Sequence, residues 1–188
     1  MASYSFKNPA TYHLLSYGTL LGSTLFQSFI SGVIAYRALP RPQFSTLQKA
    51  TFPVYFSLQT ALPIGLLLTY PSGSPRLLPF LSSTPVLQSP TDRLNAWLLG
   101  TMFVTAVVNL LYVGPQTTRV MVERKHQETR DGKMAYDKGP HSGDMERLNW
   151  EFTVLHSVSS VTNLVGLGAM VWYGAVLGSR LTFERTAL

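Results

Sequence analysis

Polar side chains that are able to bind or to transfer protons recur inside otherwise apolar stretches, and the densest group lies near the C-terminus. His156, Ser159, Ser160 and Asn163 stand at positions i, i+3, i+4 and i+7. That spacing puts all of them on one face of a helix. Such a face predicts either a polar pocket or a set of hydrogen bonds to neighbouring helices.

Similar side chains occur singly in the other apolar stretches, and Gln27 and Ser31 share a helical face. The full set is Gln27, Ser31, Gln59, Asn109, His156, Ser159, Ser160 and Asn163. One interpretation is a small-molecule pocket or a permeation path. The other is hydrogen bonding between helices, worth about 0.6–2 kcal/mol per contact. We favour the second, because none of these groups is a carboxylate or a formal cation, as a proton or ion relay requires.

Signs of catalysis or of metal binding are missing from the sequence. The chain has no cysteine, which excludes thiolate nucleophiles and thiolate metal sites. His13 and His156 are expected near opposite membrane surfaces, and His126 and His141 lie in a polar loop without a ligand spacing. We therefore predict no catalytic residue, no metal site and no cofactor.

The elements that carry these side chains follow from the distribution of charge. Asp, Glu, Lys and Arg are absent between Lys7 and Arg37, Lys49 and Arg76, Arg93 and Arg119, and Glu151 and Arg180. A helix needs about 20 apolar residues to cross a hydrocarbon layer of ~30 Å. The sequence therefore predicts an all-α membrane protein, a four-transmembrane-helix bundle forming one domain over residues 1–188. The expected spans are residues 12–36, 50–70, 94–113 and 152–179.

Proline and glycine set the expected limits of the spans. Proline lacks the backbone N–H and disfavours helix in the residue before it. Pro40 is expected to break the first helix, and Pro53 to lie in the opening turn of the second span. Pro63 predicts a kink, and Gly114-Pro115 is expected to end the third span. Residues 71–90, with five prolines, are expected to form a linker.

The polar loop over residues 116–151 is expected to begin with a short amphipathic surface helix at residues 117–130. Its expected ion pairs are Arg119 with Glu123 and Arg124 with Glu128, each four residues apart. Gly132 is expected to end this helix. Asp144 is a candidate cap for a helix that continues into the fourth span.

The positive charges predict the orientation of the chain. The first and third loops carry Arg37, Arg41, Lys49, Arg119, Arg124, Lys125, Arg130, Lys133, Lys138 and Arg147. The other side carries Lys7, Arg76, Arg93, Arg180 and Arg185. Ten against five favours cytoplasmic odd loops and non-cytoplasmic termini. The expected partner is the lipid bilayer, with a homo-oligomer or another membrane protein as the alternative. Nucleic acid is not expected, because the net charge of +6 is not gathered in a dense run.

Three segments together resemble the transmembrane protein 205 family, four-span eukaryotic proteins with a domain of unknown function. The first contains Arg37, Pro40 and Arg41 and continues to Pro53 and Tyr55; the second is Pro115-Gln116-Thr117-Thr118; the third runs from His156 to Asn163. The resemblance implies a four-helix membrane bundle and a secretory or plasma-membrane location. Members are linked to tolerance of platinum drugs, and no established reaction comes with the family.

The sequence and the resemblance together leave three functions open. A non-enzymatic scaffold or adaptor of an endomembrane or plasma membrane accounts best for the missing catalytic groups. A small transporter, or a lipid- or drug-handling protein, would use the polar face of the fourth span. A small four-span membrane oxygenase is the third alternative. A location in the endoplasmic reticulum or secretory pathway is expected, and a mitochondrial membrane is the alternative.

Overall fold

The computed structural model describes residue 6, residues 8–70 and residues 89–179. Within these ranges every element is helical. The elements are α1 (Pro9–Leu25), η1 (Phe26–Ser31), α2 (Gly32–Ala38), α3 (Arg41–Leu68), α4 (Pro90–Val108), η3 (Asn109–Val113), α5 (Gly114–Asp131) and α6 (Gly143–Ser179). The proline-rich linker expected at residues 71–90 lies almost entirely outside the described residues.

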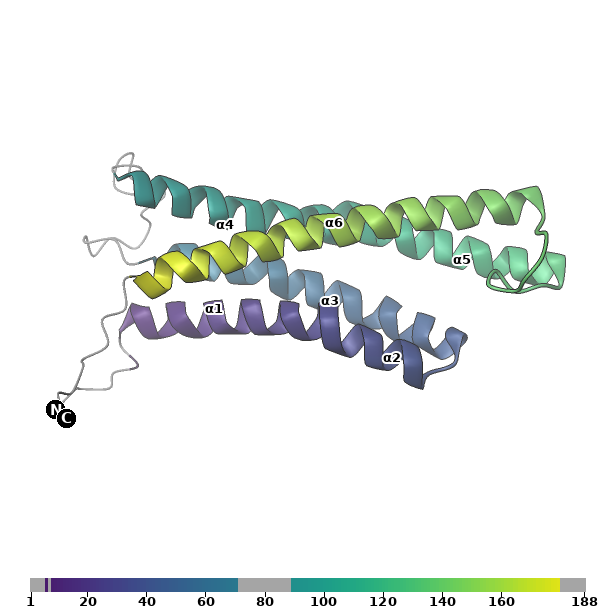
Figure 1. Ribbon diagram of the computed structural model, residues 1–188, viewed down its shortest axis with the longest axis horizontal. Coiled ribbons are helices and arrows are strands. Elements are labelled where there is room, and N and C mark those ends of the chain that lie inside the picture. The colour runs from purple at the N-terminus through teal and green to yellow at the C-terminus, as the bar shows by residue number, and fades with distance from the viewer. Residues whose placement is uncertain (1–5, 7, 71–88, 180–188) are drawn as a thin grey trace.

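These elements join into four long helices that lie side by side (Figure 1). The first combines α1, η1 and α2, and the third combines α4, η3 and α5. Each of the four is long and apolar enough to cross a membrane. The expected all-α, four-span bundle is thereby confirmed.

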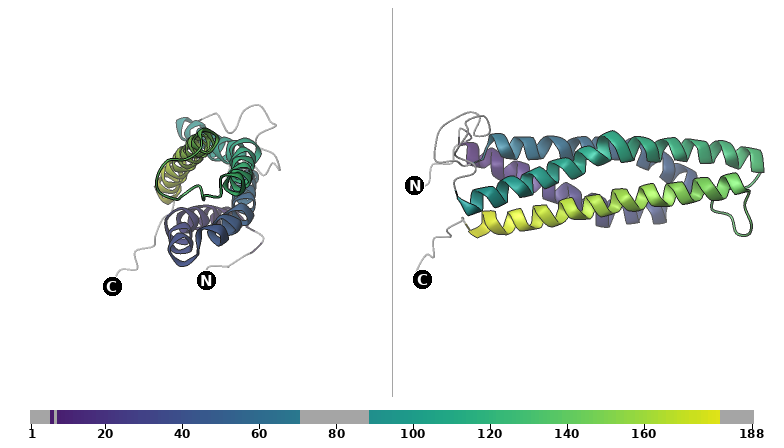
Figure 2. Two further views of the ribbon diagram at one scale, coloured as in Figure 1. Left: turned by 90° about the vertical axis from the view of Figure 1, so that its right-hand side faces the viewer. Right: turned by 90° about the horizontal axis from the view of Figure 1, so that it is seen from above.

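Both connections between described helices lie at one end of the bundle. The turn from α2 to α3 and the loop from α5 to α6 lie at this end, called here the loop end (Figures 1 and 2). α1 begins and α6 ends at the opposite end, called here the terminal end. The first and third loops therefore lie on the same side, as two crossings between them require.

The second span begins earlier than expected. α3 starts at Arg41, directly after Pro40 as its N-cap, and runs through both Pro53 and Pro63. The expected linker before residue 50 is therefore helix, and Pro53 is not in an opening turn. Pro42 explains the early start, because a proline in the first turn lacks an N–H that would have no partner there in any case.

The third long helix does not end at Gly114-Pro115. The chain passes from α4 through η3 into α5 as one helix, Pro90–Asp131. In η3 the Gly114 N–H bonds to the Asn109 carbonyl, five residues back, in the wider π-helical pattern. This bulge stands immediately before Pro115 and makes room for its ring. A Cβ on Gly114 would lie 2.7 Å from the Asn109 carbonyl oxygen, so a side chain there would clash.

Residues 117–130 form a helix as expected, but as the continuation of the third span. α5 ends at Asp131 with Gly132 in the left-handed conformation, at φ 61°, which confirms the predicted stop. The expected pair of Arg119 and Glu123 is present at 2.9 Å. Glu128 pairs with Lys125 at 3.0 Å, because the Arg124 guanidinium lies 4.6 Å from the centre of the Phe152 ring on α6.

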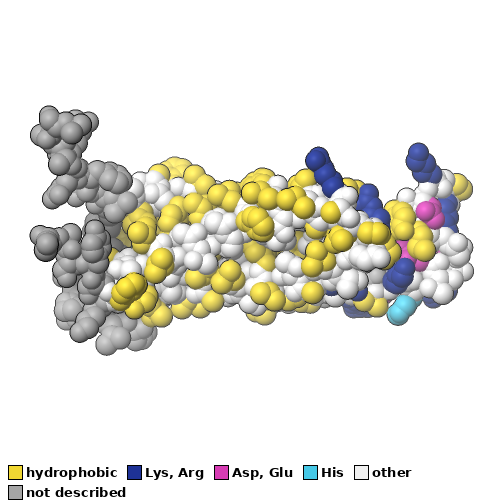
Figure 3. All heavy atoms as spheres, turned by 90° about the horizontal axis from the view of Figure 1, so that it is seen from below, with side chains coloured by type: hydrophobic (Ala, Val, Ile, Leu, Met, Phe, Trp, Pro, Cys, Tyr) yellow, Lys and Arg dark blue, Asp and Glu magenta, His cyan; other side chains and the backbone are white. Residues whose placement is uncertain are grey.

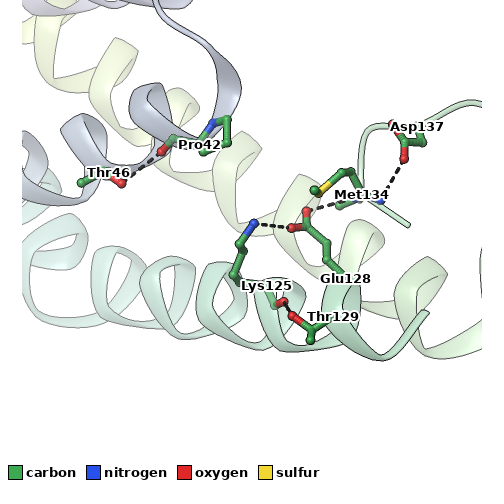
Figure 4. A network of polar contacts seen from close by, with 8 residues as sticks. Pro42, Thr46, Lys125, Glu128, Thr129, Met134 and Asp137 are labelled. Atoms are coloured by element: carbon green, nitrogen blue, oxygen red, sulfur yellow. Dashed lines mark hydrogen bonds and ion pairs between the residues drawn. The ribbon is translucent and has the colours of Figure 1, made fainter. Parts of the chain in front are cut away.

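Only residues 132–142 of the expected polar loop connect helices, and side chains fix them. Glu128 accepts hydrogen bonds from Lys125 Nζ and from the Ala135 N–H, both at 3.0 Å (Figure 4). Asp137 accepts one from the Met134 N–H at 2.9 Å. Ser142, and not the expected Asp144, accepts from the N–H of Met145 at the start of α6. These contacts join α5, the loop and α6 from residue 143 to 152, called here the α5–α6 hairpin.

The outer surface of the bundle is apolar along most of its length. Figure 3 shows hydrophobic side chains along one face and charged ones gathered toward the loop end. Trp97 is 78% exposed and Leu111 is 71% exposed, values that suit contact with lipid. The core between the helices contains Leu20, Leu66, Leu99, Met102, Met170 and Tyr173.

Candidate functional site

A polar cluster lies between the first, second and fourth helices. We call it the central cluster; its members are Ser23, Thr24, Ser28, Tyr55, Gln59 and Asn163. Thr24 donates to the Gln59 side-chain carbonyl at 2.9 Å, and the Gln59 amide donates to Ser23 at 3.0 Å. Tyr55 donates to the Asn163 carbonyl oxygen, and the Asn163 amide donates to Ser28, both at 2.8 Å. These bonds join helices far apart in sequence.

Asn109 forms a second junction, between the third and fourth helices. Its amide donates to the Thr162 hydroxyl at 2.8 Å and to the Thr105 carbonyl at 3.2 Å. Its side-chain oxygen is buried and has no hydrogen-bond partner among the described residues. A cavity of about 10 Å³ borders Asn109, Asn163 and Gln59, which is room for roughly one water molecule. The described interior at this level is closed to anything larger.

The remaining candidate residues are not part of these junctions. Gln27 and Ser31 are half-buried, and His156 and Ser160 are exposed. The His156 ring stacks on Phe152 with the ring centres 5.8 Å apart, and Ser160 donates to the His156 carbonyl. Ser159 is half-buried and offers its carbonyl to Thr162. The polar face of α6 is therefore divided. Asn163 faces the neighbouring helices, and His156 faces outward.

A second polar cluster lies near the terminal end and draws on all four long helices. We call it the terminal cluster; its members are His13, Thr69, Tyr70, Asp92, Asn95 and Tyr173. His13 is 2% exposed, with Nδ1 at 3.0 Å from the Thr69 hydroxyl and Nε2 at 2.8 Å from the Tyr173 hydroxyl. Tyr70 donates to Asp92 and accepts from the Asn95 amide, both at 2.7 Å. Ser89 caps α4 and also donates to Asp92.

The proton arrangement at His13 follows from Thr69. The single Thr69 hydroxyl proton is donated to the Gly65 carbonyl at 2.7 Å, so toward His13 this hydroxyl accepts. His13 Nδ1 therefore donates to Thr69, and Nε2 is paired with the Tyr173 hydroxyl. Both ring nitrogens thus have a partner.

Sequence reasoning missed the terminal cluster because its members were assigned separately. Tyr70 closed the expected second span, Asp92 lay before the expected third span, and His13 was considered only as a metal ligand. Asn95, however, falls inside that span and is 3% exposed. A buried amide one turn after a carboxylate was a signal of interhelical bonding. Span hydroxyls such as Thr24, Thr105 and Thr162 carried the same signal.

The residues that carry the family resemblance serve the helix junctions. Arg37 lies in the last turn of α2, Pro40 caps α3, and Arg41 begins it. Pro53 lies inside α3, and Tyr55 belongs to the central cluster. Pro115, Thr117 and Thr118 lie in the first turns of α5. Thr117 donates to the Val113 carbonyl at 2.7 Å within the continuous helix.

The arrangement as a whole holds helices together. Among the described residues, no three His, Asp or Glu side chains come close enough to bind a metal ion. His13 and His156 lie at opposite ends, because Tyr173, the partner of His13, stands 17 residues beyond His156 on α6, about 25 Å along the helix. The chemistry that the two clusters display is mutual hydrogen bonding of neutral groups, with Asp92 at the terminal rim.

Comparisons with known proteins agree with a membrane protein whose activity is not defined. Residues 15–126 match the family model described as a domain of unknown function, DUF4149. The chain is 34% identical to xanthocillin biosynthesis cluster protein D of Aspergillus fumigatus over 174 residues, 93% of this chain and 92% of that one. No solved structure matches. On this evidence the chain belongs to the DUF4149 family.

Proposed function

We propose that this membrane protein is a non-enzymatic scaffold or adaptor that engages its partner through the α5–α6 hairpin. One observation carries the proposal: the polar groups inside the bundle are mostly used by one another, whereas the hairpin extends past the α2–α3 turn (Figure 1). The cavity of about 10 Å³ beside Gln59, Asn109 and Asn163 is too small for a substrate. The proposal therefore places the interaction on the outer surface.

The hairpin has the properties of a protein-binding element. Its ion pairs and its loop hydrogen bonds fix its shape before binding, which lowers the entropic cost of association. The loop exposes Met134 and Tyr136, which are 39% and 55% exposed. Methionine and tyrosine are enriched in protein interfaces. The name of the Aspergillus relative connects that protein with a biosynthesis cluster, so the proposed partner is a component of a biosynthetic assembly.

The test uses photo-crosslinking from the hairpin in the host cell. A photoreactive amino acid replaces Tyr136, and the matched control carries it at Tyr112, which is 66% exposed on the apolar surface. We expect one discrete protein adduct from position 136, identified by mass spectrometry, that is lost when Met134→Ser is added. Adducts at position 136 only with lipid or with a second copy of the chain would contradict an adaptor role.

A small transporter remains the alternative, and one observation favours it. The unpaired side-chain oxygen of Asn109 borders the small cavity in the middle of the bundle, where a permeating polar molecule would need a partner. This function requires the cavity to widen. It predicts that Asn109→Leu abolishes a transport or resistance phenotype while the protein still inserts. Three points stay predictions: membership of the transmembrane protein 205 family, the organelle and the orientation of the termini.

A further inference from the structure

The first two long helices carry positive charge without any negative charge. Residues 8–70 contain Arg37, Arg41 and Lys49 and no Asp or Glu. All three lie in or near the α2–α3 turn, and none has an ion-pair partner within the described part of the chain. Arg37, Arg41 and Lys49 therefore form a patch of three uncompensated cations at the turn and in the adjoining part of α3.

In the α5–α6 hairpin, at the same end of the bundle, positive charges are paired with negative ones. Arg119 pairs with Glu123 and Lys125 pairs with Glu128. Arg147 lies 3.9 Å from both Asp144 and Glu151. The hairpin thus neutralises much of its charge internally, and the α2–α3 turn does not. An anion drawn to this end of the molecule meets its strongest unscreened attraction at the turn.

An aromatic side chain holds Arg41 in place. The Arg41 guanidinium lies 3.8 Å from the centre of the Tyr36 ring, and the Phe44 ring meets Tyr36 edge-on at 5.4 Å. Arg37 and Arg41 are exposed. Lys49 lies eight residues further along α3, about 12 Å deeper.

The patch lies where a membrane presents phosphate. It stands at the boundary between the apolar surface of the spans and the charged loop end, and Tyr36 is a typical residue of that boundary. Guanidinium groups bind phosphate oxygens through two parallel hydrogen bonds. We propose that the α2–α3 turn binds the headgroup of an anionic phospholipid. Arg37 and Arg41 contact its phosphate, and Lys49 strengthens the attraction.

The test titrates the full chain in neutral detergent with fluorescent phosphatidylserine and, as the reference, with fluorescent phosphatidylcholine. We expect tighter binding of phosphatidylserine that weakens as salt is added. In the variant R37Q/R41Q, affinity for phosphatidylserine should fall about 25-fold, from about fivefold per cation. Affinity for phosphatidylcholine should change little. Y36L, which removes the ring beneath Arg41, should cause a smaller loss.

The matched control is R130Q/K138Q, which removes the same charge from exposed positions of the hairpin. It should keep the affinity of the unaltered chain. Equal binding of the two lipids by the unaltered chain overturns the proposal without any variant. Equal losses in the two double variants also overturn it, because they indicate a response to net charge alone. Competition by inorganic phosphate at the same concentration as the lipid would show a site for free phosphate, and the lipid proposal would be wrong.

Discussion

His13 was a candidate metal ligand in the sequence, but in the structure its side chain joins helices. Both of its ring nitrogens are paired, one with Thr69 and one with Tyr173, in an almost fully buried position. Replacing His13 with Phe removes both hydrogen bonds from this almost fully buried position. We expect a loss of about 1–3 kcal/mol in the free energy of unfolding, seen as a lower Tm in detergent.

The matched control for His13 is the same change at His156, which is exposed and stacks on Phe152. His156→Phe should leave the Tm nearly unchanged, because no buried partner is lost. Equal losses of Tm in the two variants would contradict the packing account of the terminal cluster.

Tyr55 allows a test of the central cluster by the loss of one oxygen atom. Tyr55→Phe keeps the ring and leaves the Asn163 carbonyl oxygen without its 2.8 Å bond. We expect about 0.6–2 kcal/mol of destabilisation, measured by thermal or denaturant unfolding in detergent. Tyr112→Phe, on the exposed surface, is the control and should be neutral. A neutral Tyr55→Phe would mean that the central cluster does not stabilise the bundle.

Single residues were predictable from the sequence only in part. The buried amides Gln59, Asn109 and Asn163 stood out because amides are costly in apolar spans. Their partners did not, since threonine and tyrosine are frequent in such spans and pair according to how helices rotate against each other. That rotation depends on tertiary contacts, such as the approach of Gly174 to the Tyr17 hydroxyl, that no single segment contains.

Among the elements, a change at Gly114 tests how the third long helix continues through Pro115. A Cβ there would come 2.7 Å from the Asn109 carbonyl oxygen, so Gly114→Ala must shift η3. We expect about 1–3 kcal/mol of destabilisation, as for other overpacked sites, measured by unfolding in detergent. Gly18→Ala is the control, because a Cβ at Gly18 meets nothing within 4 Å. It should be neutral or slightly stabilising. An equally neutral Gly114→Ala would show that the bulge adapts without cost.

The existence of four helices could be predicted, and their ends could not be. Charge-free intervals identify the apolar segments directly. Proline at Pro53 and Pro115 was taken as a boundary, but both lie within long helices. Proline stops a helix in water because it loses a hydrogen bond, whereas in a membrane protein neighbouring helices and π-type adjustments compensate for that loss. Gly132 was correctly placed, because many helices end at a left-handed residue and glycine adopts that conformation without strain.

For the whole molecule, the structure predicts that the α2–α3 turn and the α5–α6 loop lie on the same side of the membrane. The chain has no cysteine, so single cysteines introduced at Gln43 and at Ser142 are the only thiols in their variants. Both positions are exposed at the loop end. In sealed vesicles, a membrane-impermeant thiol reagent should label both from the same side, and the positive charges predict that side to be cytoplasmic. Labelling from opposite sides would contradict the four-span topology.

The central claim is that the four-span bundle is closed inside, with its polar groups used to join helices. The most direct measurement is the rate at which a water-soluble thiol reagent labels a cysteine at Ala106, which borders the small cavity and is 6% exposed. Cysteine at Ser142 is the reference for water, and cysteine at Val104, on the outer apolar surface, is the reference for lipid. We expect the cysteine at position 106 to react as slowly as the one at position 104 and far more slowly than the one at position 142. Labelling at position 106 as fast as at position 142 would show a water-filled interior and contradict it.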